Sequence, residues 1–352
     1  MENILNFYKD KKVFITGHTG FKGAWLSKIL LNLSANVTGY ALSPNTEPNL
    51  FDICKLNKEI DSIIGDIRDI DKLSKTMNEA KPDIVFHLAA QPLVRDSYKN
   101  PRYTYETNVM GTVNILEAIR NTSSVKSFLN ITTDKVYRNN EWCWGYREDE
   151  YLDGFDPYSN SKSCSELVTA TYKRSFFENN GVSVSTARAG NVIGGGDFAT
   201  DRIIPDCVRA AQTNNLVILR NPNSIRPYQH VLEPLFAYIL IAQKQYENKS
   251  LADNYNVGPN EKDCVTTSEL VSLFCNKWQD NLRWASKSDS GPHEANFLKL
   301  DCSKIKNKLC WVPKFNIENA IEKTTEWYKA YLNNEDVSKL MENQIKEYTN
   351  WR

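Results

Sequence analysis

Three consecutive residues with side chains that can bind or move protons stand in the stretch ITTDKVY, residues 131–137. Ile131 ends an apolar run, and Thr133, Asp134 and Lys135 then bring a hydroxyl, a carboxylate and an amine. Such groups at the end of an expected buried strand admit two interpretations. The stretch is either a solvated turn or a row of catalytic groups at the mouth of a pocket.

A tyrosine and a lysine with helical spacing follow in DPYSNSKSCSELV, residues 156–168. Tyr158 and Lys162 are four residues apart, so on a helix they project from one face. An ammonium beside a phenol favours the phenolate and lowers the pKa of the phenol toward neutrality. The pair therefore predicts a tyrosine that accepts a proton from a substrate hydroxyl.

A glycine-rich turn, GHTGFKG at 17–23, separates an expected strand over 11–17 from an expected helix over 24–33. Glycines at such a turn let the backbone approach a pyrophosphate, and the helix N-terminus offers free N–H groups. The turn predicts a dinucleotide site. The next expected strand ends in TGYALSPN, with neither an acid for a ribose 2′-hydroxyl nor an arginine for a 2′-phosphate. This strand end therefore does not choose firmly between NAD and NADP. Asp66 is either an adenine ligand or a turn residue.

Strands alternate with helices through the first 190 residues. Helices are expected between most of these strands, including one over 101–121, and such alternation is typical of a parallel sheet covered on both faces. The fold class is therefore α/β, a doubly wound parallel sheet with a smaller mixed C-terminal lobe. The expected strands are 11–17, 35–42, 62–67, 83–90, 125–133, 183–190 and 253–259.

The overall composition is that of an ordinary globular protein. Of the 352 residues 41% are hydrophobic, and 43 Lys and Arg balance 43 Asp and Glu, which argues against nucleic acid or an anionic membrane as partner. We find no signal peptide and no run long and apolar enough to span a bilayer, so we expect a cytoplasmic protein. The eight cysteines form no Cys-x-x-Cys pair, so neither a disulfide framework nor a metal site is expected.

Together these motifs resemble the extended short-chain dehydrogenase/reductases, and among them the nucleotide-sugar 4,6-dehydratases, most closely the branch that acts on CDP-glucose. The resemblance covers essentially the whole chain. It implies a Rossmann domain over 1–190, with contributions from about 228–258, and a nucleotide-sugar-binding lobe over 191–227 and 259–352. The stretches that carry it are GHTGFKGAWL, TGYALSPNTEPNLF, HLAAQ, TNVMGT, TTDKVYRNNEWCWGYREDEYLDGFDPYSNSK, RAGNVIGGGDFATDRIIPD, RPYQHVLEPL and PHEANFLKLD.

The resemblance implies NAD as the cofactor, with NADP not excluded, together with a set of cofactor contacts and a course of reaction. Tyr158 begins the oxidation of the sugar C4, and Thr133 hydrogen-bonds the C4 oxygen. The 4-ketone acidifies C5–H, Asp134 protonates the departing C6 hydroxyl, and the hydride returns to C6 to give a CDP-4-keto-6-deoxyglucose for deoxysugar biosynthesis (O-antigen or capsule). The implied cofactor-binding residues are Gly17, Thr19, Gly20, Phe21, Gly23, Asp66, Ile67, Leu88, Ala89, Ala90, Gln91, Asn108, Tyr158 and Lys162.

Lys135 is the position with an open role. Many relatives that use other nucleotides carry glutamate here as the base for C5, whereas this chain has lysine, as the CDP-glucose branch does. A lysine must be neutral to accept a proton, and burial or nearby positive charge favours that form. Lys135 is thus either the C5 base or an electrostatic stabiliser of the enolate, and a surface position is the third alternative.

The planar guanidinium group of arginine can donate two parallel hydrogen bonds to the phosphate oxygens of a nucleotide sugar. Several arginines lie in the loop-rich second half of the chain. We expect Arg226 to be the main phosphate ligand. Trp142, Trp144 and Tyr146 either wall the hexose site or pack among themselves. The expected substrate-binding residues are Asn191, Arg202, Arg220, Arg226, Asn256, His293 and Glu294.

Other functions on the same scaffold stay open at this point. They are a 4,6-dehydratase for another GDP- or CDP-linked hexose or heptose, a 4-epimerase or decarboxylase, and a non-catalytic dinucleotide sensor. Asp134 after Thr133 favours dehydration over epimerisation, and Tyr158 with Lys162 argues against a sensor. The family also leads us to expect a homodimer or a dimer of dimers, formed through helices at 101–121 and 157–178.

Overall fold

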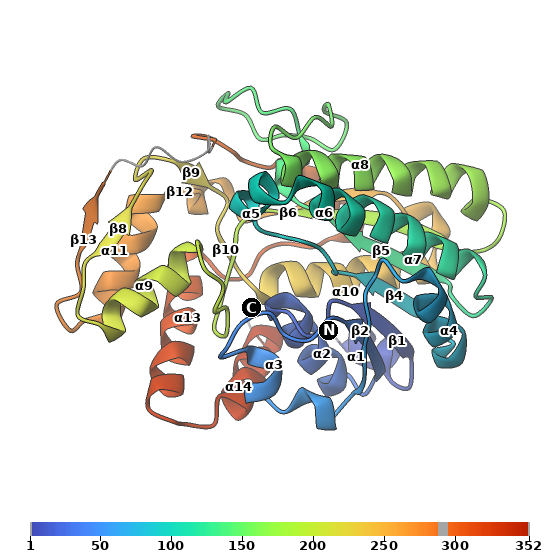
Figure 1. The fold of residues 1–352 in the computed structure, drawn as a ribbon, viewed down its shortest axis with the longest axis horizontal. Coiled ribbons are helices and arrows are strands. Elements are labelled where there is room, and N and C mark those ends of the chain that lie inside the picture. The colour runs from blue at the N-terminus through green and yellow to red at the C-terminus, as the bar shows by residue number, and fades with distance from the viewer. Residues whose placement is uncertain (1, 288–294, 351–352) are drawn as a thin grey trace.

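The computed structural model describes residues 2–287 and 295–350 and is built around a seven-stranded parallel sheet (Figure 1). The strand order is β11-β6-β5-β4-β1-β2-β3, so the predicted doubly wound α/β fold is confirmed. All seven predicted strands of the sheet are present, with ends that differ by a few residues. They are β1 (Lys12–Thr16), β2 (Asn36–Ala41), β3 (Asp61–Ile64), β4 (Ile84–His87), β5 (Ser127–Ile131), β6 (Ser183–Ala189) and β11 (Asn254–Val257).

Helices cover both faces of the sheet, which explains why its strands are apolar without alternation. In β1, for example, Val13 and Ile15 pack into one hydrophobic core, and Phe14 packs into the core on the other face. Helices α2 (Phe21–Asn32) and α10 (Leu232–Glu247) cover the first face. Helices α4 (Ile70–Ala80), α7 (Gly111–Arg120) and α8 (Pro157–Tyr172) cover the second.

The helix predicted over 101–121 is interrupted. The structure has α6 (Pro101–Tyr105), a π-helical turn (Glu106–Met110) and then α7. The wider turn aims Asn108 at the backbone of Gln91, where its amide accepts a hydrogen bond from the Gln91 N–H and donates one to the Gln91 carbonyl. Turns of this kind are frequent at functional sites, and here the turn ties the helix to the loop after β4.

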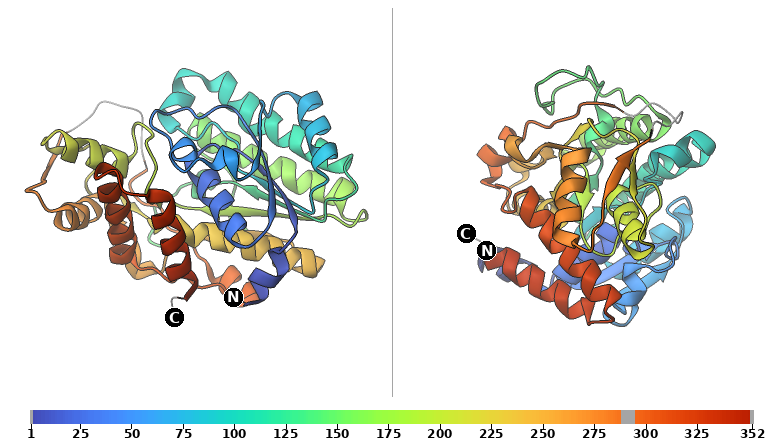
Figure 2. Two further views of the ribbon diagram at one scale, coloured as in Figure 1. Left: turned by 90° about the horizontal axis from the view of Figure 1, so that it is seen from below. Right: turned by 90° about the vertical axis from the view of Figure 1, so that its left-hand side faces the viewer.

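The second half of the chain contributes small sheets and the C-terminal helices. Three two-stranded sheets pair β10 (Gln229–His230) with β7 (Val192–Ile193), β12 (Val265–Thr266) with β9 (Ile225–Arg226), and β13 (Trp284–Ser286) with β8 (Val217–Leu219). Figure 2 shows the C-terminal helices α13 and α14 beside each other. No helix in the described part of the chain is both long and apolar enough to cross a membrane. The other helices are α1 (Glu2–Tyr8), α3 (Leu50–Ile53), α5 (Val94–Lys99), α9 (Ile203–Gln212), α11 (Thr267–Trp278), α12 (Ser303–Leu309), α13 (Ile317–Leu332) and α14 (Val337–Asn350).

Candidate active site

A cleft with a volume of about 1590 Å³ lies over the carboxyl ends of the central strands, where open α/β sheets bind their ligands. Most of the predicted site residues line it. They are Gly17, Thr19, Gly20, Phe21, Gly23, Asp66, Ile67, Leu88, Ala89, Ala90, Gln91, Thr133, Lys135, Tyr158, Asn191, Arg202, Arg220 and Arg226. Four others, Asn108, Asp134, Lys162 and Asn256, do not belong to this lining.

The turn between β1 and α2 has the shape of a cradle that only glycine permits. Gly17 has φ +80°, and a Cβ there would lie 2.8 Å from the backbone nitrogen of Ala89. A Cβ on Gly23 would lie 2.1 Å from the Gly17 carbonyl oxygen. The hydroxyl of Thr19 donates to the carbonyl of Leu42 and holds the turn against the end of β2. Helix α2 therefore begins at the cleft, where its free N–H groups fit the pyrophosphate of a dinucleotide.

Asp66 lies in the cleft and is held by a neighbouring arginine. The Arg68 guanidinium bonds both carboxylate oxygens, with Nη2 2.7 Å from Oδ2, and these hydrogen bonds hold the pKa of Asp66 below its usual value. The Arg68 N–H also donates to Oδ1, so Asp66 is a turn residue as well as a cleft residue. Asn108, which was predicted to bind the cofactor, is buried outside the cleft lining, and both ends of its amide bond to Gln91 and Ser161.

Helix α8 places the predicted tyrosine at the cleft. The Asp156 carboxylate caps the helix by accepting from the Ser159 N–H at 2.9 Å, and Pro157 occupies the first helical position. Tyr158 follows in the first turn and is 9% exposed. Lys162, one turn later and 3% exposed, donates from Nζ to the Ile131 carbonyl at 3.1 Å. The lysine thereby ties α8 to the end of β5.

The titration of the tyrosine differs from the prediction. Burial raises the pKa of Tyr158 to about 12, and a hydrogen bond with Thr133 and the charge of Arg202 only partly offset this. The prediction that Lys162 lowers this pKa toward neutrality is therefore wrong for the protein without its ligands. The ammonium is directed at a backbone carbonyl, and desolvation dominates. Burial also lowers the pKa of Lys162 itself to about 8, against an opposing effect of Glu166.

Asp134 and Lys135 form an ion pair at the end of β5. The Asp134 carboxylate is completely buried, and its Oδ1 accepts from the Thr133 hydroxyl at 2.9 Å and from Lys135 Nζ at 3.3 Å. Its other oxygen, Oδ2, is buried and accepts no hydrogen bond from the described residues. Asp134 thus lies directly behind Thr133 and Lys135, which face the cleft.

The sequence analysis missed Lys22, which lies in the cleft at the first turn of α2. Burial, followed by the charges of Lys162 and Arg202, lowers the pKa of Lys22 to about 7, while Asp134 acts in the opposite direction. The available signal was a charged residue inside the glycine turn. The sequence cannot show that this amine lies near a lysine and an arginine that are far away along the chain.

The three predicted phosphate ligands lie together but differ in their contacts. Arg202 Nε lies 3.8 Å from Asp197, and Arg220 Nη1 lies 3.1 Å from Asp201, so both are paired with carboxylates of one loop. Arg226 is 7% exposed and donates to the backbone carbonyl of Ala295.

Asn256, which was predicted to bind the substrate, lies outside the cleft lining. It is fully buried, and its amide donates to the carbonyls of Tyr146 and Asp301. His293 and Glu294 lie outside the described residues.

The aromatic residues at 142–146 pack among themselves and do not line the cleft. Trp142 stacks on Tyr146 with ring centroids 5.3 Å apart, and Tyr146 stacks on Tyr137 at the same separation. Trp144 contacts Trp142 edge to face and is otherwise 68% exposed. Of the two interpretations of these aromatics, the structure agrees with packing.

The chain is similar to nucleotide-sugar enzymes over nearly its whole length. A sequence model of the family described as GDP-mannose 4,6 dehydratase matches residues 14–324. The chain is 49% identical to the CDP-glucose 4,6-dehydratase of Salmonella typhimurium, over 97% of each protein. It is 28% identical to the dTDP-glucose 4,6-dehydratase of Shigella flexneri, over 92% of this chain and 94% of that protein.

A solved structure supports the fold. The dTDP-glucose 4,6-dehydratase of Bacillus anthracis, in complex with NAD, superimposes with a TM-score of 0.76 at 21% identity, over 94% of this chain and 99% of that chain.

Proposed function

The chain belongs to the family described as GDP-mannose 4,6 dehydratase, and we propose that it is an NAD-dependent nucleotide-sugar 4,6-dehydratase that acts on CDP-glucose. The similarity to the Salmonella typhimurium protein supports the choice of substrate. The observation that carries the reaction type is the buried carboxylate of Asp134, which bonds to Thr133 from behind the cleft wall, while Tyr158 bonds to the same threonine in the cleft. A hydroxyl-expelling reaction needs such an acid, whereas epimerisation at C4 does not.

The glycine cradle, Ile67 and the loop at 88–91 would hold the cofactor, and Arg226 with Arg202 and Arg220 would hold the substrate pyrophosphate. When bound, NAD would supply a hydride acceptor for C4 and, in its reduced form, a hydride donor for C6. Tyr158 takes the proton of the C4 hydroxyl, and Thr133 hydrogen-bonds the C4 oxygen. The bound sugar and the cofactor's positive charge must lower the pKa of Tyr158 from about 12 for this step to proceed near neutrality.

The ion pair between Lys135 and Asp134 suggests how the water is lost. Transfer of one proton from the ammonium to the carboxylate turns the pair into a neutral amine and a neutral carboxylic acid. The amine then takes the C5 proton, and the acid gives its proton to the C6 hydroxyl, which leaves as water. Both residues return to their charged forms, so protons balance over the step. Oδ2 of Asp134 is the oxygen that has no other hydrogen-bond donor among the described residues.

We also propose NAD rather than NADP as the cofactor. The cleft residues at the end of β2 and after it would face the adenosine ribose, and in the described cleft none of them carries a positive charge for a 2′-phosphate. These residues are Ala41, Leu42, Ser43, Asn45, Thr46 and Asn49. Titration with both dinucleotides tests this, and tighter binding of NADP would contradict it.

The experiment that tests the function is incubation of the purified protein with CDP-glucose, followed by measurement of the alkali-induced ultraviolet absorbance of a 4-keto sugar. A panel of UDP-, GDP- and dTDP-glucose provides the controls for the base. Accumulation of CDP-galactose would identify a 4-epimerase and contradict the proposal. Absence of any product from every nucleotide hexose would favour a dinucleotide sensor.

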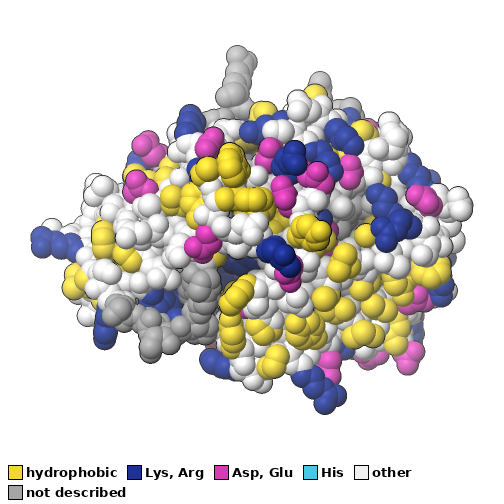
Figure 3. All heavy atoms as spheres, turned by 90° about the horizontal axis from the view of Figure 1, so that it is seen from above, with side chains coloured by type: hydrophobic (Ala, Val, Ile, Leu, Met, Phe, Trp, Pro, Cys, Tyr) yellow, Lys and Arg dark blue, Asp and Glu magenta, His cyan; other side chains and the backbone are white. Residues whose placement is uncertain are grey.

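A second copy of this chain is the protein partner we propose, bound over the outer helices of the second sheet face. Figure 3 shows hydrophobic side chains gathered in broad patches on one face of the molecule. Several large apolar side chains on α5, α6 and α8 and on the π-helical turns that follow α6 and α8 are at least one-third exposed, namely Tyr98, Tyr103, Tyr105, Met110, Leu167 and Phe176. Analytical ultracentrifugation of the wild type and of Leu167→Glu tests the dimer, because a buried charge should dissociate it.

A further inference from the structure

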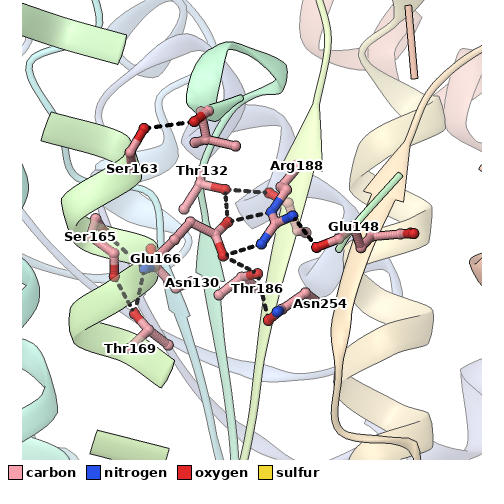
Figure 4. A network of polar contacts seen from close by, with 12 residues as sticks. Asn130, Thr132, Glu148, Ser163, Ser165, Glu166, Thr169, Thr186, Arg188 and Asn254 are labelled. Atoms are coloured by element: carbon pink, nitrogen blue, oxygen red, sulfur yellow. Dashed lines mark hydrogen bonds and ion pairs between the residues drawn. The ribbon is translucent and has the colours of Figure 1, made fainter. Parts of the chain in front are cut away.

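A buried ion pair lies directly beneath the proposed catalytic residues. Glu166 on α8 and Arg188 on β6 have side chains 2% and 1% exposed, and they meet through two hydrogen bonds of 3.0 and 2.9 Å (Figure 4). A bidentate interaction between a guanidinium and a carboxylate fixes the relative orientation of the two groups in addition to pairing their charges. Burial by itself would raise the pKa of Glu166. The charge and hydrogen bonds of Arg188 outweigh this effect and hold the pKa of the carboxyl below its usual value.

The pair bonds to both ends of the segment that carries Thr133, Asp134 and Lys135. At its start, the Thr132 hydroxyl donates to Glu166 at 2.5 Å. At its end, Arg188 Nη1 donates to the Tyr137 hydroxyl at 2.8 Å. The segment over 132–137 is therefore fixed at two points by one ion pair. Thr186 on β6 donates to the second oxygen of Glu166 and completes the connection between helix and sheet.

The same pair determines where α8 lies. Tyr158, Lys162 and Glu166 are spaced by four residues, so they succeed one another on one face of the helix. The first two are proposed to act on substrate and cofactor, whereas Glu166 points to β6 (Figure 4). The helix can neither rotate nor slide along the sheet without breaking the bonds to Arg188, Thr132 and Thr186.

We propose that Glu166 and Arg188 are positioning residues of the reaction, which hold the 132–137 segment and the Tyr158 face of α8 at a fixed distance from each other. This inference rests on the proposed function for its kinetic test but not for its structural test. A buried ion pair is weak evidence for stability, because two apolar side chains of similar volume often serve as well. Its bonds to both catalytic elements provide a reason for its presence that stability does not.

The decisive variant is the double replacement Glu166→Met, Arg188→Met. A single replacement leaves one buried charge unpaired and is expected to unfold the protein. The double variant removes both charges of the pair. Each hydroxyl that loses a bond keeps another acceptor, and the Glu148 carbonyl loses its bond from Arg188 Nη1. Thr132 keeps the Ala187 carbonyl, Thr186 keeps Asn254, and Tyr137 keeps Asn256. We therefore expect a folded protein with a melting temperature near that of the wild type.

The expected result is a fall in kcat of about 100-fold, with a much smaller change in KM, because small misplacements of reacting groups cost rate. The split between kcat and KM is the readout that a purely structural role would not produce.

Hydrogen–deuterium exchange gives the test that needs no substrate. In the double variant, amides over 132–137 and the first turns of α8 should exchange faster. The matched control is Lys28→Met, which removes another buried cation, bonded to Glu59 and Glu342 on the far side of the sheet. It should lower the melting temperature without changing kcat or exchange at 132–137.

The possible failures are distinguishable. A wild-type protein that does not convert CDP-glucose contradicts the proposed function, and exchange in the double variant still decides the positioning role. A folded double variant with unchanged exchange at 132–137, or with kcat within threefold of an active wild type, would overturn the inference.

Discussion

The Nζ atom of Lys135 lies 3.3 Å from Oδ1 of Asp134, so the proposed base and the proposed acid of the dehydration are bonded to each other. The lysine side chain is 30% exposed and the aspartate side chain 1%, which places the amine toward the cleft and the carboxylate behind it. In the proposed mechanism, one proton transfer within this pair would give the neutral amine and the neutral acid that the elimination uses. The pair would thus allow a lysine, rather than a carboxylate, to act as the base at this position.

Replacement of Asp134 by asparagine should stop the reaction between oxidation and dehydration. The new amide would still accept a hydrogen bond from Thr133, but an amide cannot give a proton to a leaving hydroxyl. On addition of CDP-glucose we expect the near-ultraviolet absorbance of reduced nicotinamide to appear and persist, while 4-keto-6-deoxy product falls by about 100-fold or more. Turnover at the wild-type rate would assign the acid role to another group.

Replacement of Lys135 by methionine should remove the proposed base for C5 and leave the proposed acid, Asp134, in place. The variant keeps the length of the side chain but has no amine to take the C5 proton. We expect loss of solvent deuterium incorporation at C5 together with loss of product, measured by mass spectrometry of the sugar. If product formation survives with normal deuterium uptake, Lys135 acts only through its charge or not at all.

Tyr158→Phe should reduce kcat by about two to four orders of magnitude, because it removes the proposed acceptor of the C4 proton. The phenol bonds to Thr133 at the cleft, so its loss should leave the melting temperature nearly unchanged. Tyr105→Phe, at another cleft tyrosine that donates to Asn160, serves as the control and should remain active. A Tyr158→Phe enzyme with wild-type rates would remove the tyrosine from the mechanism.

The charge of Arg202 lowers the pKa of Tyr158, so its removal should move the pH profile. The phenolate is the form that accepts a proton, and it predominates above the pKa. Arg202→Met should therefore shift the limb of kcat/KM that rises with pH to higher pH, whereas Arg202→Lys should largely preserve it. A profile that stays in place in Arg202→Met would show that the arginine contributes binding alone.

The buried Glu233 should make stability depend on pH. Its carboxylate accepts from the backbone N–H groups of Lys314 and Phe315 and from the Tyr348 hydroxyl, yet burial raises its pKa from 4.5 to about 7. Because the folded-state pKa is raised, the contribution of this group is complete below pH 4.5 and is lost as pH rises to about 7. The loss corresponds to about 3 kcal/mol.

The Glu233→Gln variant tests this dependence, since the glutamine does not titrate and can still accept from both N–H groups. Its melting temperature relative to the wild type should rise between pH 5 and pH 8. Glu322→Gln, at an exposed pair with Lys277, should show no such trend. Parallel curves for Glu233→Gln and wild type would contradict the assignment.

The local sequence pattern was sufficient to predict the strands of the sheet and the glycine-rich turn at 17–23. Each strand is an apolar run bounded by turn residues, which is the pattern expected of a strand that is buried on both faces. The glycines at 17 and 23 are required by backbone contacts within the turn and its neighbouring loop, so their spacing was informative. The helix break at 106–110 was missed, because the contact between Asn108 in this turn and Gln91 on another element leaves no signal in the local periodicity.

The sequence by itself determined which elements form and which residue types follow β5 and begin α8, because hydrophobic periodicity and helix capping act over a few neighbouring residues. Only the tertiary structure decided the protonation and partners of these groups. Desolvation by the surrounding fold raises the pKa of Tyr158 to about 12, and the contact between Glu166 and Arg188 joins residues 22 positions apart. Burial and charge pairing depend on distances in space, and the order of residues along the chain does not contain those distances.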